Sequence, residues 1–199
     1  KEAVKRGLTE YFIIDTAFWM IPIGIVGARL YYVLFELDYY LNNPARIFYI
    51  WEGGLAIYGG IIAGFLVVYY KCKKENVPIA LFTDVLTPYV LLAQAIGRWG
   101  NFINQEAHGG EVSRQFLESL MLPNFIIDQM NIEGVYYHPT FLYESVWSLI
   151  GVALILYIRN KEKFLLRGET TAGYLIWYGI GRLFIEGMRT DSLYMGPFR

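Results

Sequence analysis

Residues 11–35 read YFIIDTAFWMIPIGIVGARLYYVLF, and this apolar stretch decides the fold class. Crossing a bilayer core of ~30 Å takes about 20 mostly apolar residues, so the stretch predicts a membrane-spanning helix. Four further stretches have the same character, at about 54–70, 79–97, 140–158 and 171–188. The sequence therefore predicts an all-α, polytopic transmembrane helix bundle with about five spans in a single integral-membrane domain, residues 1–199.

The composition agrees with a membrane protein. Of 199 residues, 55% are hydrophobic and only 18% are charged, whereas soluble domains carry about a quarter charged residues. A net charge of -1 argues against a nucleic-acid partner. A single cysteine, Cys72, excludes a disulfide within the chain, and the two histidines, His108 and His138, form no zinc-like grouping. We therefore expect no metal and no cofactor.

Charge in the connecting segments predicts the topology. Basic residues lie before the first span and after the second and fourth spans, whereas the segments 36–53 and 98–139 are mainly acidic. The positive-inside rule then orients all five spans alternately without conflict. Residues 98–139 become a long external segment, and a connection of that length suggests a lid or a small cap. The basic residues are Lys1, Lys5, Arg6, Lys71, Lys73, Lys74, Arg159, Lys161, Lys163 and Arg167.

Several ionisable residues lie within or at the ends of the predicted spans. Each costs at least ~2.5 kcal/mol at the bilayer centre, so it should face a partner or a cavity. For Asp15, Arg29 and Asp84, helix-joining ion pairs and a functional role are equally compatible with the sequence. The remaining members gather toward the external ends of the spans: Arg98, Glu144, Arg182, Glu186 and Arg189.

The fifth span carries a polar stripe. Tyr178, Arg182, Glu186 and Arg189 are spaced by 4, 4 and 3 residues, which places them on one helix face. Arginines outnumber the glutamate there, and the planar guanidinium suits phosphate oxygens. A self-neutralised polar seam is the alternative interpretation.

Small residues are also patterned. Gly60 and Gly64 form a GxxxG motif, which is typical of close helix packing. Gly59 and Gly60, beside Tyr58, would alternatively let a large headgroup approach the backbone.

Residues 97–109 read GRWGNFINQEAHG. This donor-rich rim at the end of an apolar span suits a phospholipid headgroup. It also matches, position for position, the G-R-x-G-N-F-x-N-x-E-x-x-G motif of prolipoprotein diacylglyceryl transferases, and the chain resembles that bacterial family elsewhere. The other matching stretches are GARLYY at 27–32, GGLAIYGG at 53–60, HPTFLYE at 138–144 and YGIGRLFIEGMR at 178–189.

The resemblance implies an enzyme of the bacterial inner membrane with its active site toward the outer leaflet. Such an enzyme takes the diacylglyceryl group of phosphatidylglycerol and transfers it to the lipobox cysteine of a prolipoprotein signal peptide. A thioether forms and glycerol-1-phosphate leaves. Family members resemble seven-span proteins, so we expect this chain, which begins at Lys1 without Met, to be an internal piece lacking one span at each end.

By the same resemblance, Arg98 and Arg182 should stabilise the phosphate. Asn101 and Asn104 should donate hydrogen bonds to the headgroup or to each other, with Glu106 and Gly109 shaping the turn. The expected headgroup site is completed by Tyr178, by Glu186, which should orient Arg182, and by Arg189, which should gate or pair rather than react. Glu144, a second candidate for holding an arginine, is a supporting residue, as are Gly59 and Gly60.

The proton acceptor is left open by the sequence. Many relatives have a histidine where this chain has Tyr58, and a phenol of pKa ~10 is a poor base unless nearby arginines lower that value. Either Tyr58 only hydrogen-bonds the headgroup, or the leaving phosphate takes the proton. His108 is a weaker candidate base, and His138 is expected to cap the fourth span. A transporter or channel, with charges lining a pathway, remains the alternative function.

Overall fold

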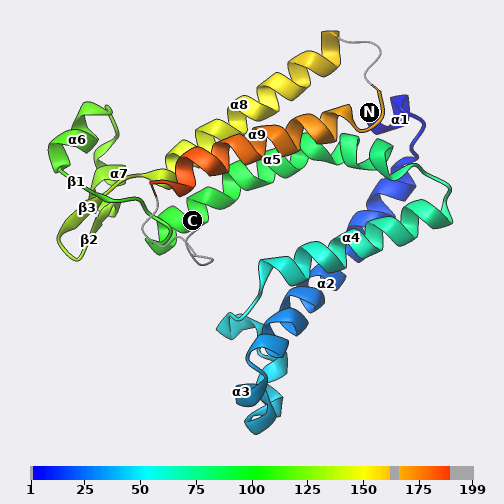
Figure 1. Cartoon of the computed structure of the whole chain (residues 1–199), viewed down its shortest axis with the longest axis horizontal. Coiled ribbons are helices and arrows are strands. Elements are labelled where there is room, and N and C mark those ends of the chain that lie inside the picture. Colours follow the sequence, from blue (N-terminus) through cyan, green and yellow to red (C-terminus); the bar gives the residue numbers. More distant parts are fainter. Residues whose placement is uncertain (1, 162–165, 189–199) are drawn as a thin grey trace. The chain divides into compact units, whose positions relative to one another are not determined.

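The computed structural model describes residues 2–161 and 166–188, which divide into two compact units, Lys1–Val85 and Leu86–Arg199 (Figure 1). The first unit contains α1 (Glu2–Lys5), α2 (Glu10–Phe35), α3 (Leu37–Asn42), the 3₁₀ turns η1 (Pro44–Phe48) and η2 (Ile50–Glu52), and α4 (Ile57–Lys74). Helix α5 (Ile79–Asn104) begins there and enters the second unit. The second unit continues with β1 (Glu111–Val112), α6 (Arg114–Ser119), α7 (Asn124–Gln129), β2 (Asn131–Ile132), β3 (Val135–Tyr137), α8 (Thr140–Lys161) and α9 (Glu169–Glu186).

The long helices confirm an all-α membrane bundle. By length and composition, α2, α5 and α8 could each cross a membrane. The other two expected spans correspond to α4 and α9, which are 18 residues long and carry three charged residues each. Membrane crossing by α4 and α9 therefore stays a prediction.

Helices α2 and α4 pack antiparallel through glycine. A Cβ at Gly27 would lie 2.8 Å from the Gly59 carbonyl oxygen, and one at Gly59 would lie 3.0 Å from the Ala28 Cα. Only a residue without a side chain permits this approach of two backbones. At the other end of the pair, Lys71 forms an ion pair with Asp15. This contact confirms the ion-pair interpretation for Asp15.

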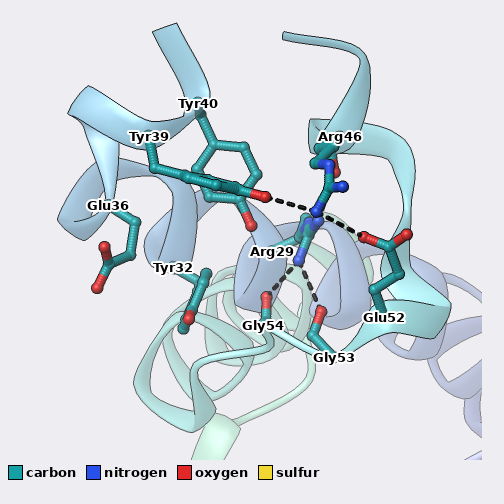
Figure 2. A pocket seen from close by; sticks show the side chains of 9 residues that line it. All are labelled: Arg29, Tyr32, Glu36, Tyr39, Tyr40, Arg46, Glu52, Gly53 and Gly54. Atoms are coloured by element: carbon teal, nitrogen blue, oxygen red, sulfur yellow. Dashed lines mark hydrogen bonds and ion pairs between the residues drawn. The ribbon is translucent and has the colours of Figure 1, made fainter. Parts of the chain in front are cut away.

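Arg29 lines a cavity, and its guanidinium donates to backbone carbonyls rather than to a carboxylate among the described residues. It is 6% exposed, and Figure 2 shows its guanidinium surrounded by the segment between α2 and α4. All three of its nitrogens donate to backbone carbonyls, of Ile47 (2.9 Å), Gly53 (2.7 Å), Gly54 (2.9 Å), Arg46 (2.6 Å) and Tyr49 (3.3 Å). The sequence could not predict this role, because backbone carbonyls become partners only once the segment has folded around the side chain.

The segment that we predict to be external forms a small cap rather than a loop. Its strands pair antiparallel in the order β1-β3-β2, with Val112 opposite Tyr136 and Ile132 opposite Val135. The tight turn between β2 and β3 places Glu133 (φ 53°) and Gly134 (φ 88°) in the left-handed region, as a two-residue hairpin requires. The buried core of the cap comprises Leu117, Ile126, Ile127, Met130 and Phe141.

Helix α5 is longer than its hydropathy predicts. We expected it to end at residue 97, but it continues to Asn104, so Arg98, Asn101 and Asn104 lie on helical turns and the segment outside the helix begins after Asn104. The polar residues of these turns have partners, and Phe102 packs against Phe141 at 4.5 Å between ring centroids. The hydropathy of the sequence falls at residue 98, whereas the helix itself continues to Asn104.

Two tryptophans join α8 to α9. The rings of Trp147 and Trp177 stack at 4.2 Å and 13°. Each indole N–H donates to the other tryptophan's backbone carbonyl, at 3.1 and 3.0 Å. Each ring also lies over a glycine of the facing helix, Trp147 over Gly181 and Trp177 over Gly151. The W-x-x-x-G pattern thus occurs once in each helix and fixes how the two helices align.

The tryptophan contact can be tested with Gly181→Ala. The added Cβ would lie 2.6 Å from the Trp147 Cδ1, so we expect destabilisation by about 1–3 kcal/mol from overpacking. Gly179→Ala is the matched control, since a Cβ there meets nothing within 4 Å. Thermal unfolding of the full-length protein in detergent should show a lower Tm for the first variant only. Equal Tm values would contradict a close contact.

The cap should weaken in acid through His138. Burial lowers the pKa of His138 from its ordinary value of 6.5, where its ring packs against Phe116. The unfolded cap therefore binds the proton more readily than the folded cap as the pH falls below 6.5, and stability is lost in that direction. Protease protection of the cap should fall between pH 7 and 5 in the wild type, and fall less in His138→Gln.

Candidate functional site

A buried carboxylate lies between the two predicted phosphate-binding arginines. Glu144 of α8 is 6% exposed and forms ion pairs with Arg98 of α5 and with Arg182 of α9, the latter at 3.8 Å between Oε1 and Nη1. Three helices therefore contribute to one charged cluster. The sequence assigned Glu144 a supporting role, and the structure places it at the centre.

Arg182 has a second carboxylate partner. It pairs with Glu186 four residues later on α9, as the spacing predicts. The expected excess of arginine depended on Arg189, which lies outside the described residues. The described part of the cluster contains two arginines and two glutamates. An excess of arginine through Arg189 therefore stays a prediction, and so does the alternative of a self-neutralised seam.

The cluster borders a cavity with a volume of about 20 Å³. This is room for roughly one water molecule, so a phosphate group needs the surrounding side chains to move. Within the described part of the chain, the contacts of Arg98 involve Nε, with Glu144, and Nη1, with Asn101 at 3.4 Å, which leaves Nη2 for a ligand. The cavity lining comprises Gln94, Arg98, Glu144, Trp147, Ser148, Tyr178, Gly181, Arg182 and Ile185.

Tyr178 lies one turn before Arg182 on α9, as the predicted stripe requires, whereas Arg189 of that stripe lies outside the described residues. Tyr178 lines the cavity together with Arg182, and its ring stacks on that of Tyr174 at 5.9 Å. The position places a phenol beside the arginines, where it is available to a bound headgroup.

The asparagines of the 97–109 motif point to a carboxylate of the same motif. Asn101 and Asn104 donate to Glu106 Oε1, at 3.0 and 3.3 Å. Asn101 meanwhile accepts from Arg98 through Oδ1, so a chain of contacts runs from Glu106 through the asparagine to the arginine. Glu106 therefore orients the amides, and the motif acts as one connected unit.

Gly109 is required by crowding. A Cβ there would lie 2.6 Å from the His138 Cβ and 3.0 Å from Thr140 Cγ2. The Gly109 N–H also donates to the His138 carbonyl at 3.1 Å. This glycine lets the cap pass the beginning of α8, which agrees with a shaping role.

Among the described residues, the side-chain contacts of the two histidines are with residues other than Arg98 and Arg182. The ring of His108 packs on Tyr137 at 4.1 Å, and His138 lies 3.3 Å from the Tyr143 hydroxyl. Both therefore have contacts in or beside the cap. Within residues 2–161 and 166–188, no group of three His, Cys, Asp or Glu side chains could hold a metal ion.

Tyr58, Gly59 and Gly60 belong to the first unit and are described there by themselves. Tyr58 lies in the first turn of α4 and is 64% exposed, so its hydroxyl is open to a ligand. Gly59 faces α2, and packing is sufficient to explain it. A role for these three residues in binding a headgroup stays a prediction.

Five cavity residues were not predicted as site residues from the sequence: Gln94, Trp147, Ser148, Gly181 and Ile185. Gln94 lies one helical turn before Arg98, and Ser148 lies one turn after Glu144. Trp147 closes one side of the cavity. The i±4 spacing of Gln94 and Ser148 from charged residues was a usable signal, whereas the position of Trp147 depends on how α8 aligns with α9.

Comparison with known proteins matches the whole chain. The model of the family described as prolipoprotein diacylglyceryl transferase matches residues 1–199. The chain belongs to this family.

Relatives named phosphatidylglycerol–prolipoprotein diacylglyceryl transferase support the assignment. The relative from Halalkalibacterium halodurans is 54% identical over 98% of this chain and 67% of its own length. Those from Lysinibacillus sphaericus and Listeria monocytogenes are 55% and 53% identical over 98% and 100% of this chain, each over 71% of its own length.

Glu144→Gln tests whether the central carboxylate positions the arginines. The amide keeps the shape but removes the charge that holds Arg98 and Arg182, so we expect kcat to fall about tenfold or more. The KM for the anionic lipid should stay unchanged or fall, because a competing negative charge is gone. Steady-state kinetics in detergent micelles check this, and a raised lipid KM with normal kcat would contradict it.

Proposed function

We infer that this chain transfers the diacylglyceryl group of phosphatidylglycerol to the lipobox cysteine of prolipoproteins. The observation that carries the inference, beside membership of the family, is the convergence of Arg98 and Arg182 on one buried carboxylate. Two guanidiniums already held at one point can exchange a carboxylate for a phosphodiester once the side chains around the small cavity move to admit it. Family membership favours transfer over the transport alternative.

The reaction alkylates a thiol. The cysteine sulfur attacks the glycerol carbon that bears the phosphate ester, a C–S bond forms, and the C–O bond breaks with its electrons passing to the phosphate oxygen. Arg98 and Arg182 stabilise the charge that develops on this oxygen. The departing group is glycerol-1-phosphate.

The thiol proton must leave as the thioether forms. A cysteine thiol has a pKa of ~8.5, so a positive field that favours the thiolate assists the attack. The released phosphate oxygen can take this proton, which balances the reaction without a separate base.

The proposed setting is the bacterial cytoplasmic membrane. All five long helices, α4 and α9 included, would cross the bilayer, and the basic ends of α4 and α8 would face the cytoplasm. The arginine cluster then lies toward the outer leaflet, where the lipobox cysteine of an exported prolipoprotein arrives. The partners are phosphatidylglycerol, the signal peptide and the bilayer itself.

The function is tested by incubating the full-length protein with phosphatidylglycerol and a lipobox peptide and then weighing the peptide. We expect a mass gain of one diacylglyceryl group on the cysteine. Arg98→Ala and Arg182→Ala should each reduce the rate at least about 100-fold, since removal of one stabilising donor costs about that much.

Arg114→Ala is the matched control. Arg114 is an exposed cap arginine paired with Glu118, so its removal should leave the rate unchanged. A mass gain that survives both site substitutions would keep the function and reject the arginine assignment. No gain with a folded wild-type protein would reject the transferase inference.

A further inference from the structure

One polar atom beside the arginine cluster has no partner. Gln94 of α5 lines the same cavity as Arg98 and Arg182, and its Oε1 is buried without a donor among the described residues. The other end of this amide is fixed, because Nε2 donates to the Tyr174 hydroxyl on α9 at 3.0 Å. A buried acceptor without a donor costs stability, so this oxygen requires a donor that the described side chains do not supply, and a water molecule or a ligand can provide it.

The position of Gln94 along α5 limits what that donor can be. At about 1.5 Å per residue, Arg98 lies roughly 9 Å and Gln94 roughly 15 Å from the Asn104 end of the helix. Gln94 is therefore deeper in the bilayer than the arginine that would hold the phosphate, whichever way the helix crosses.

The lipid cannot supply a donor at that depth. The only hydrogen-bond donors of phosphatidylglycerol are the hydroxyls of its headgroup, which lie outside the phosphate. The diacylglyceryl part, which extends inward, contains ester oxygens and hydrocarbon only. An acceptor deeper than the phosphate thus has no counterpart in the lipid substrate.

The peptide substrate does supply donors there. A peptide segment whose cysteine is presented in an extended form has backbone N–H groups that must find acceptors within the bilayer. An in-line attack also places the sulfur on the inward side of the reacting carbon, opposite the phosphate. Four residues of helix rise about 6 Å, which is of the order needed between a phosphate at Arg98 and a nucleophile beside Gln94.

We propose that Gln94 positions the peptide substrate, its Oε1 accepting a hydrogen bond from the backbone N–H of the lipobox cysteine. This proposal rests on the diacylglyceryl transfer inferred above. Gln94 binds the peptide and Arg98 binds the lipid, so neighbouring turns of α5 bind the two substrates.

The test separates the two substrates kinetically in the full-length protein. Gln94→Leu should raise the KM for the lipobox peptide about tenfold, while the KM for phosphatidylglycerol stays within twofold. A peptide with an N-methylated cysteine should show the same tenfold rise with the wild type, and no further rise with Gln94→Leu. Gln115→Leu is the control, since Gln115 is an exposed glutamine of α6 in the cap, outside the 97–109 motif.

Each outcome decides the proposal. A rise in the KM for phosphatidylglycerol alone would mean that the Gln94 amide binds the phospholipid. Additive rises in the peptide KM for the methylated peptide and for Gln94→Leu would mean that the amide and the cysteine N–H act separately. Either outcome overturns the proposal. Unchanged kinetics would mean that a water molecule satisfies the oxygen, and would overturn it too. The methylated peptide acts on the wild type, so this arm holds even if the variant does not fold. Failure of the wild type to modify the unmethylated peptide would reject the transfer reaction itself.

Discussion

The charged site of this protein depends on one buried carboxylate. Glu144 pairs with arginines of two other helices, and without it Arg98 and Arg182 would be two like charges held together in a medium of low dielectric. The same contact joins α5, α8 and α9, so the site and the bundle share an interaction. The stacked rings of Trp147 and Trp177 align α8 with α9, and this alignment determines where Glu144 meets Arg182.

Arginine has two distinct uses in this chain. Arg29 gives all three of its nitrogens to backbone carbonyls between α2 and α4, so it holds a polar segment in shape and keeps nothing for a ligand. Arg98 is held instead by Glu144 and Asn101 through two of its nitrogens. The hydrogen-bond and ion-pair partners of an arginine, rather than its residue type or its burial, distinguish a structural arginine from a candidate catalytic one.

The sequence predicts the helices better than it predicts their contacts. Apolar length located all five long helices, and the 97–109 motif identified Arg98, Asn101 and Asn104. The sequence did not predict that α5 continues through the motif. Hydropathy indicates only which residues favour lipid, whereas the polar residues of these helical turns hydrogen-bond to one another. The central position of Glu144 and the unpaired Oε1 of Gln94 depend on how three helices align. A local sequence pattern does not predict that alignment.

The carboxylate partners of the two described arginines bear on the proposed turnover. Two arginines without carboxylates would bind a phosphate group tightly, and they would retain the anionic glycerol phosphate as firmly as the lipid. Glu144 and Glu186 compete with any bound anion for the same guanidiniums, so they weaken ground-state binding of substrate and product alike. Only the extra charge that develops as the C–O bond breaks is then stabilised selectively, which is the condition for faster chemistry rather than tighter binding. The paired carboxylates thus make the arginines suitable for catalysis within a membrane.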